Sequence, residues 1–329
     1  MNRRVTLAAR PVGFPQESVF ALEEADVPSP GAGEVLVRAR WVSVDPYQRG
    51  RMSTARSYAR GLEIGDVITA QAVGEVMESN DSRYEPGDLA VGQLGWQDYV
   101  VARGGALRKL PPGLEPQLAL HILGATGLTA YFGMLDVAKP DPGDTVVVSG
   151  AAGAVGSVAG QIARIMGCRT VGIAGGTDKL ADLLDLYRFD EAVDYKTGDV
   201  RAAVRDVCPE GVDVYFDNVG GRVSTAVHAL LNVGARIAIC GQVSQYNLER
   251  LEPTFHPGLL IVFRARMQGF LVTDYAARFG EAIPRLARWV TNGDIRYREH
   301  VTEGLENAPR AFIGMLNGEN RGKALVKVM

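Results

Sequence analysis

Four glycines in one short segment are the residues whose type and spacing point most directly to chemistry. They are Gly150, Gly153, Gly156 and Gly160. They follow the apolar, β-branched run TVVV at 145–148, which is typical of a strand buried on both faces. Glycines placed after such a strand let the backbone turn sharply and bring the N-terminus of a helix close to a phosphate.

The turn departs from the strict G-x-G-x-x-G pattern at one position, because Ala151 stands where the first glycine is expected. The strand-like runs on either side, 145–148 and 169–174, still place the motif between a strand and a helix. We therefore expect a dinucleotide pyrophosphate at this turn. The residues expected to contact it are Gly153, Ala154, Val155 and Gly156.

The end of the second strand bears on which dinucleotide is bound. An acidic side chain there would bind the ribose 2′-hydroxyl, whereas a cation accommodates a 2′-phosphate. The strand 169–174 ends in two glycines, and Lys179 follows one turn into the next helix. This pattern predicts NADP(H) as the cofactor. Asp178, beside the lysine, leaves NAD as the alternative.

The composition describes an ordinary globular chain. Of its 329 residues 47% are hydrophobic and 22% are charged, and the net charge is −3. No basic excess indicates a nucleic-acid partner, and no apolar run is long enough to span a bilayer. The first residues lack the apolar stretch of a signal peptide, so a cytoplasmic location is expected.

The cysteines and histidines give no pattern of metal ligands. Cys168, Cys208 and Cys240 are widely spaced, and the four histidines are scattered along the chain. Three unpaired cysteines fit a reduced compartment, and no metal site is expected.

The order of expected elements indicates an α/β chain. Short alternating strands with frequent glycine and proline fill residues 3–110 and predict a barrel-like β unit. Helical periodicity begins near Pro116, and six strands alternate with helices from 145 onward, which predicts a Rossmann-type doubly wound parallel sheet. The final strand, helix and strand are expected to return to the β unit. The expected domains are 1–121 with 299–329, and 122–298.

Several strings, in this order, resemble the zinc-independent branch of the medium-chain dehydrogenase/reductase superfamily that includes prostaglandin, alkenal/one and curcumin reductases. They are SVDPYQRGRM (43–52), GATGLTAYFGML (124–135), GAAGAVGSVAGQIA (150–163), VDYKT (193–197), YFDNVGG (215–221), RIAICGQVSQYN (236–247), RMQGF (266–270) and GENRGKALVKV (318–328). The resemblance covers essentially the whole chain. It implies a GroES-like β-barrel catalytic domain into which the NADP-binding Rossmann domain is inserted, and a homodimer that pairs through the strand at 266–272.

The chemistry expected of this chain follows from the absence of an early cysteine that could bind zinc. Members of the superfamily that use zinc hold it with an early cysteine, where this chain has SVDP at 43–46, and no cysteine precedes Cys168. Without a Lewis acid, an activated alkene accepts hydride more readily than an isolated ketone. Hydride addition at the carbon β to a carbonyl produces an enolate, which needs a hydrogen-bond donor and then a proton.

Tyrosine is the donor that the β unit offers. Tyr47 and Tyr58 lie in loops where the superfamily builds its cleft, and we expect both to be catalytic and to contact substrate. For each, a half-buried aromatic with no catalytic role is the alternative. Arg49 is a candidate ligand for a substrate carboxylate, with decoration of the loop as its alternative. Phe263 stands where mammalian prostaglandin reductases carry a tyrosine. This difference favours a general enone reductase over a prostaglandin reductase. Phe263 is also a candidate for contact with the substrate.

The resemblance also implies cofactor contacts beyond the glycine turn. Tyr195 joins Lys179 around the 2′-phosphate, and Asn218 follows a strand at the ligand-binding edge, although it is also suited to ending that strand. Asn320 is expected to close over the nicotinamide, with an ordinary loop asparagine as the alternative. The remaining expected contacts are Cys240, Gly241, Ser244, Tyr246, Phe270 and Val272.

The function expected from these features is NADPH-dependent reduction of the C=C bond of small hydrophobic enones and enals. Two alternatives stay open: a zinc-free quinone reductase of the same superfamily, and a non-enzymatic NADPH-binding protein.

Overall fold

The structure, a computed structural model, describes residues 1–252 and 257–328. The chain divides into two compact units, which are described separately. Unit 1 comprises Met1–His121 and Glu299–Met329, and unit 2 comprises Ile122–Arg298.

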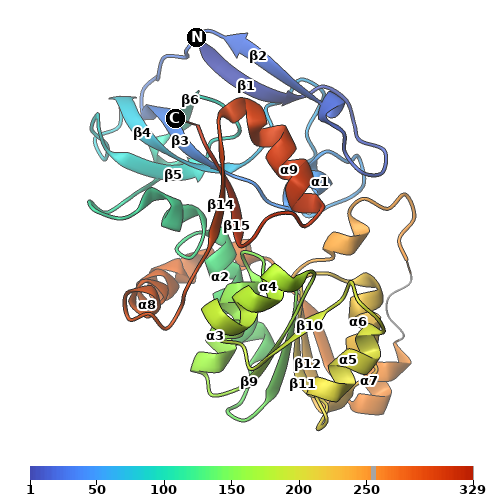
Figure 1. Cartoon of the computed structure of the whole chain (residues 1–329). Coiled ribbons are helices and arrows are strands. Elements are labelled where there is room, and N and C mark those ends of the chain that lie inside the picture. Colours follow the sequence, from blue (N-terminus) through green and yellow to red (C-terminus); the bar gives the residue numbers. More distant parts are fainter. Residues whose placement is uncertain (253–256, 329) are drawn as a thin grey trace. The chain divides into compact units, whose positions relative to one another are not determined.

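Unit 1 is built mainly of antiparallel strands. Its larger sheet has the order β14-β15-β3-β4-β5-β7, with β6 also paired to β3, and β1 pairs with β2 in a separate ribbon (Figure 1). The strands are β1 (Asn2–Leu7), β2 (Phe20–Ala25), β3 (Glu34–Ser43), β4 (Gln71–Ser79), β5 (Leu89–Gln93), β6 (Tyr99–Arg103), β7 (Arg108–Lys109), β14 (Glu299–Glu303) and β15 (Lys323–Lys327).

The interior of unit 1 follows from alternation along its strands. In β3, Val35, Val37 and Ala39 are fully buried, as period-two patterning requires. Phe20, Trp96 and Phe312 pack together with ring centroids 6.0 to 6.1 Å apart. The helices of the unit are α1 (Tyr47–Arg51) and α9 (Ala308–Leu316), with 3₁₀ turns η1 (Glu17–Val19), η2 (Gly104–Ala106), η3 (Pro116–Leu120) and η8 (Leu305–Asn307).

The C-terminal segment completes the sheet of unit 1. Strand β15 pairs antiparallel with β3, bringing Leu325 opposite Ser43, and parallel with β14. The predicted return of the last strands to the N-terminal part of the chain is therefore confirmed. One consequence is that Lys323, at the start of β15, lies beside the segment that follows β3.

Unit 2 contains a six-stranded parallel sheet of order β10-β9-β8-β11-β12-β13. Counted within the unit this is 3-2-1-4-5-6, the order of a doubly wound dinucleotide-binding sheet, so the predicted fold class is confirmed. The strands are β8 (Thr145–Ser149), β9 (Arg169–Ala174), β10 (Glu191–Asp194), β11 (Val212–Asp217), β12 (Leu231–Ile239) and β13 (Arg266–Gly269).

Helices cover both faces of this sheet, with α3 on one side and α5 and α6 on the other (Figure 1). The α-helices are α2 (Ala125–Phe132), α3 (Gly156–Ile165), α4 (Thr177–Ala181), α5 (Val200–Val207), α6 (Gly221–His228), α7 (Gly258–Phe263) and α8 (Phe279–Thr291). Shorter helical segments are η4 (Gly133–Ala138), η5 (Asp182–Leu186), η6 (Val243–Gln245) and η7 (Val272–Arg278). Pro284 lies inside α8.

The helix expected from Pro116 is not continuous. The 3₁₀ turn η3 ends at Leu120, and α2 begins only at Ala125. A Cβ on Gly127 would lie 1.9 Å from the carbonyl oxygen of Ile122, so the chain folds back too closely for any residue but glycine. Periodicity alone does not detect such a break because the apolar spacing continues through it.

Candidate functional site

The glycine turn of unit 2 has the geometry of a phosphate cradle. Gly150 adopts a φ of +60°, and the N–H of Gly153 donates to its carbonyl oxygen at 3.0 Å. A Cβ on Gly156 would lie 2.3 Å from the same oxygen. The turn therefore fits only if these positions stay small.

Helix α3 begins directly after this turn. Ala154 and Val155 lead into it, and Gly156 is its first residue. The first N–H groups of a helix have no intrahelical acceptor and face outward along the positive end of the helix dipole. The cradle and these donors have the geometry that suits a pyrophosphate, and the predicted contacts of Gly153, Ala154, Val155 and Gly156 with it stay predictions.

A positively charged cluster lies where strands β9 and β10 end. The pKa of Lys179 is lowered, first by burial and then by the charge of Lys196, while Asp182 opposes the shift. A Cβ on Gly175 would lie 2.7 Å from the ring of Tyr195 and 2.8 Å from Cε of Lys196. These side chains are therefore packed around Gly175, just after the end of β9. Because the cluster contains two lysines, this arrangement suits an added anion.

Sequence reasoning identified Lys179 and Tyr195 in this cluster but missed two cations. Lys196 directly follows Tyr195, and its position in the string VDYKT was the available signal. Arg222, from α6, donates to the carbonyl oxygen of Tyr195 at 3.0 Å. No sequence signal connects Arg222 to this strand end, since the contact arises from the crossover of the sheet.

Asn218 connects two strand tips. Its Nδ2 donates to the carbonyl oxygen of Ser149 at 2.7 Å, and its backbone N–H donates to Ser149 Oγ at 3.0 Å. The preceding residue, Asp217, is buried and accepts hydrogen bonds from Ser149, Tyr215 and Ser224. Through these bonds Asn218 stabilises the edge of the sheet. Its predicted contact with the cofactor stays a prediction.

The loop after β12 folds onto this edge. The N–H groups of Cys240 and Gly241 donate to the carbonyl oxygen of Asp217 at 2.8 and 3.1 Å. Ser244 Oγ donates to the carbonyl oxygen of Val219 at 2.7 Å, and the Tyr246 hydroxyl accepts from the N–H of Gln242 at 3.3 Å. Burial and the nearby Asp217 raise the pKa of the Cys240 thiol to about 12, so this thiol stays protonated.

Two further expected cofactor residues follow β13. Phe270 packs edge-on against Phe216 with centroids 6.2 Å apart, and a Cβ on Gly133 would lie 2.3 Å from its ring. Val272 begins η7 and is half-buried. Both lie beyond the carboxyl end of a parallel strand, the edge at which ligands bind in such sheets.

In unit 1, Tyr47 is the first residue of α1 and is half-buried. Its hydroxyl oxygen is buried beside the side chain of Gln93. Burial and the negative charge of Asp45 raise the pKa of this phenol well above its usual value, while the polar side chain of Gln93 and the charge of Arg51 oppose the rise. The side chain is therefore a neutral hydrogen-bond donor at ordinary pH.

Tyr58 differs from Tyr47 in its surroundings. Its side chain is 62% exposed, and the guanidinium of Arg51 lies 5.8 Å from its ring centroid. The negative charge of an ionised Tyr58 would raise the pKa of Tyr47. The two tyrosine side chains therefore lie near each other. The structure gives Tyr58 no comparable buried hydroxyl.

Arg49 is a buried residue whose guanidinium donates to the carbonyl oxygens of Gly13 at 2.8 Å and Pro11 at 3.4 Å. These bonds hold a neighbouring loop, and the predicted contact of Arg49 with a substrate carboxylate stays a prediction.

The other two expected residues also have structural contacts. Phe263 ends α7 and packs against the core of unit 2. Asn320, in unit 1, donates from Nδ2 to the carbonyl oxygen of Gly322 at 2.6 Å, which closes its own loop. Their predicted contacts with substrate and cofactor stay predictions.

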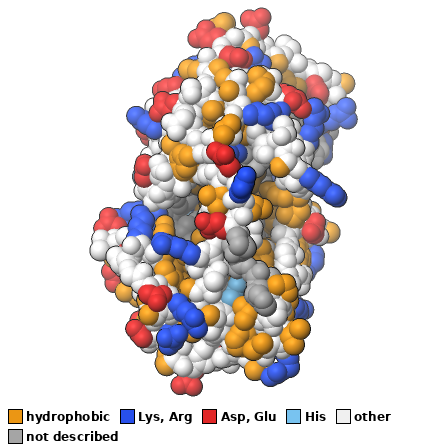
Figure 2. Space-filling model, turned by 90° about the vertical axis from the view of Figure 1, so that its right-hand side faces the viewer, with side chains coloured by type: hydrophobic (Ala, Val, Ile, Leu, Met, Phe, Trp, Pro, Cys, Tyr) orange, Lys and Arg blue, Asp and Glu red, His pale blue; other side chains and the backbone are white. Residues whose placement is uncertain are grey.

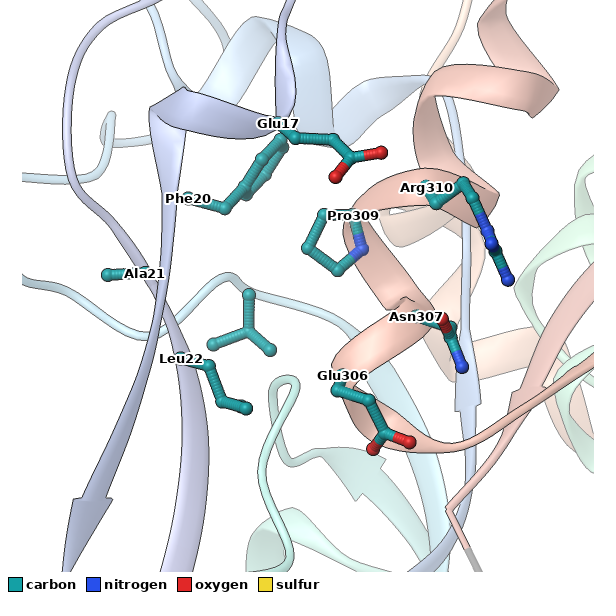
Figure 3. Close-up of a pocket in the computed structure, with 9 residues that line it drawn as sticks. Glu17, Phe20, Ala21, Leu22, Glu306, Asn307, Pro309 and Arg310 are labelled. Carbon is teal, nitrogen blue, oxygen red and sulfur yellow. The ribbon is translucent and has the colours of Figure 1, made fainter.

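Unit 1 carries two surface hollows. One of about 270 Å³ is lined by Arg51, Arg60, Gly61, Leu62, Asp66 and Thr69, and so borders α1. The other, about 240 Å³, lies between η1, β2 and the start of α9, with Glu17, Glu306 and Arg310 at its edge (Figure 3). The second hollow contains none of the predicted site residues.

The described residues, 1–252 and 257–328, hold no group of three or more His, Cys, Asp or Glu side chains placed to bind a metal ion. Within the same residues, no helix has the length and apolar character needed to cross a membrane.

Comparison with known proteins identifies the family. Residues 3–110 match the family model described as N-terminal domain of oxidoreductase, and residues 154–288 match that described as zinc-binding dehydrogenase. An NADPH-dependent curcumin reductase of Escherichia coli is 44% identical over 99% of this chain and 97% of its own length. The chain belongs to the medium-chain dehydrogenase/reductase superfamily, in its zinc-independent reductase branch.

Other members of the branch agree in sequence and structure. Prostaglandin reductase 1 of Rattus norvegicus is 44% identical over 96% of this chain and 95% of its own length. The crystal structure of CurA from Vibrio vulnificus in complex with NADPH is 44% identical, covers 99% of both chains and has a TM-score of 0.96. The predicted resemblance is therefore confirmed over the whole fold.

Proposed function

We propose that this protein is an NADPH-dependent reductase that saturates the C=C bond of α,β-unsaturated ketones and aldehydes. The observation that carries the proposal is the buried hydroxyl of Tyr47, which lies beside Asp45 and Gln93 and has a raised pKa. The relatives named as curcumin and prostaglandin reductases support the reaction class.

The cofactor is NADP(H). The glycine cradle and the N-terminus of α3 hold its pyrophosphate, and the cluster of Lys179, Lys196 and Tyr195 receives its 2′-phosphate. The surroundings of Lys179 support this role, because its pKa is lowered by burial and then by the charge of Lys196, and an anion bound between the two ammonium groups would oppose both effects. When bound, NADPH supplies the hydride that adds to the substrate carbon β to the carbonyl.

The protein's own contribution is to the substrate oxygen. Hydride addition moves the alkene electron pair toward the carbonyl oxygen, and Tyr47 donates a hydrogen bond to that oxygen as it becomes negative. The α carbon then takes a proton from water, which completes the saturated product. A phenol suits this task because it is uncharged before the reaction and its raised pKa keeps its proton in place.

A parallel assay tests the proposed reaction. Either but-3-en-2-one or a benzoquinone is added to a mixture of purified protein and NADPH. NADPH oxidation is followed in both reactions, and the products are identified by NMR. We expect butan-2-one from the enone. Turnover of the quinone alone would contradict the proposal in favour of a quinone reductase. Tight NADPH binding without turnover of any electrophile would favour a non-enzymatic protein.

We further propose that the protein forms a homodimer through β13. This strand is at the edge of the parallel sheet, where its backbone is open to pairing. In the adjoining α7, Ile261 and Val262 are 79% and 60% exposed, and Figure 2 shows hydrophobic side chains gathered on the side that carries α7. Light scattering during size-exclusion chromatography would detect a mass twice that of the chain; a monomer at all concentrations would contradict the proposal.

A further inference from the structure

A buried ion pair lies beneath the segment that carries Tyr47. The ammonium group of Lys323, a residue only 1% exposed, donates to Asp45 Oδ1 at 2.8 Å and to the carbonyl oxygens of Val44 at 2.8 Å and Ala324 at 3.0 Å. Lysines are rarely buried so completely unless they are paired. The pair joins positions 278 residues apart in sequence.

The segment 43–48 is fixed on both sides of Tyr47. On one side, Asp45 Oδ2 accepts a hydrogen bond from Ser43 Oγ. On the other, the fully buried Gln48 accepts from the N–H of Asp45 at 2.9 Å and donates to the carbonyl oxygen of Thr69 at 2.7 Å. Tyr47 therefore lies between two anchored residues in a turn that depends on the ion pair.

We infer that Lys323 and Asp45 are positioning residues for Tyr47, holding the segment 43–48 so that the tyrosine hydroxyl is presented in a fixed place. Stability alone does not account for such a pair, because neutral residues of similar volume usually stabilise a protein as well or better. The inference rests on the role of Tyr47 in the proposed function.

The carboxylate of the pair also acts on the phenol. The groups that face Tyr47 within unit 1 are Asp45, Arg51, Tyr58 and Gln93, and Asp45 is the strongest of the charged neighbours. Its negative charge raises the pKa of Tyr47, and the same carboxylate pairs with the ammonium of Lys323. Removing the carboxylate should therefore lower the pKa of Tyr47, whereas removing only the lysine should not lower it.

The test follows Tyr47 directly by NMR of protein labelled with ¹³C at tyrosine Cζ, with Tyr47→Phe used to assign its signal. In Asp45→Asn, we expect the signal to titrate at least about one pH unit earlier than in the wild-type protein. In Lys323→Met it should titrate no earlier. Both variants should lose about tenfold in kcat for an enone, with the KM for NADPH changed less than about twofold.

Two variants control for folding and for charge. Lys327→Met removes a half-exposed lysine that lies on the same strand as Lys323 and pairs with Glu303. This variant should change neither the titration of Tyr47 nor kcat for an enone. If a single variant fails to fold, the double variant Asp45→Asn with Lys323→Met leaves no buried charge and is expected to fold. It should retain the loss in kcat, because the turn is no longer held.

The inference is overturned if the folded variants titrate at Tyr47 as the wild-type protein does and keep kcat within about twofold. Failure of the proposed function is a different result. If Tyr47→Phe retains full activity, the tyrosine is not the donor, while the NMR titration still shows whether the pair controls its surroundings.

Discussion

Two regions of this protein handle charge in opposite ways. In unit 1, the segment 43–48 surrounds the hydroxyl of Tyr47 with buried groups and a nearby anion, Asp45, which keeps the phenol neutral. In unit 2, the cluster of Lys179, Lys196 and Tyr195 holds two cations near each other, and the pKa of Lys179 is lowered first by burial and then by the charge of Lys196. One region protects a neutral donor, and the other concentrates positive charge.

The difference corresponds to the two kinds of negative charge that the proposed reaction presents. A phosphate is permanently charged, so fixed cations bind it even though they repel each other in the free protein. The oxygen of an enolate is charged only briefly, so a neutral donor that strengthens its hydrogen bond as charge develops is better suited.

Replacing Tyr47 by Phe should have the largest effect. Loss of the phenol should lower kcat for an enone by about 10² to 10³, the range typical of removing one hydrogen-bond donor from a developing oxyanion. Affinity for NADPH, measured by fluorescence titration, should change little because the cofactor residues are untouched. Equal kcat in the variant and the wild-type protein would remove Tyr47 from the mechanism.

The pH dependence of the wild-type protein should reflect the same phenol. Because the pKa of Tyr47 is raised, its protonated form persists through the alkaline range in which an ordinary tyrosine ionises, about pH 10. The alkaline decline of kcat should therefore lie above pH 10, or above any earlier loss caused by unfolding. Circular dichroism at each pH separates these two causes.

Removing a cation from the cluster should have the next largest effect. Lys179→Ala should weaken NADPH binding about 10- to 100-fold, as expected for loss of a charge-assisted hydrogen bond, and NADH binding less than about threefold. Lys179→Arg, which keeps the charge, should lose less. Equal losses for both cofactors would show that this lysine does not bind the 2′-phosphate.

Crowding the same cluster should have a smaller effect. In Gly175→Ala the new Cβ would approach the Tyr195 ring at 2.7 Å, so this ring and Lys196 must move. We expect NADPH binding to weaken about 3- to 10-fold, since the charges stay but their positions change. Gly280→Ala is the matched control, because a Cβ there meets no atom within 4 Å, and calorimetry should detect no change in affinity.

Tyr58→Phe should have the smallest effect on enone reduction. Its side chain is 62% exposed and lacks the buried hydroxyl that distinguishes Tyr47. We expect kcat and KM within about twofold of the wild-type values. A loss as large as that of Tyr47→Phe would mean that the exposed loop, rather than the fixed segment 43–48, supplies the donor.

Much of the fold could be predicted because its signals are local. Buried parallel strands read as apolar, β-branched runs such as 145–148, and the glycines after them identify the turn. Lys179 was recognisable because it follows a strand tip with no acid. The break before Ala125 was missed, since the contact between Gly127 and Ile122 leaves the apolar spacing unchanged.

By itself, the sequence determined the order of the strands, the phosphate-binding turn and the absence of an early zinc-ligand cysteine, because each depends on residues close together in the chain. Only the tertiary structure decided that Tyr47 and Tyr58 differ in burial, that Arg222 contacts Tyr195, and that Lys323 pairs with Asp45. Burial and electrostatic environment depend on distance in space, and β15 brings its lysine to Asp45 only when the last strand pairs with β3.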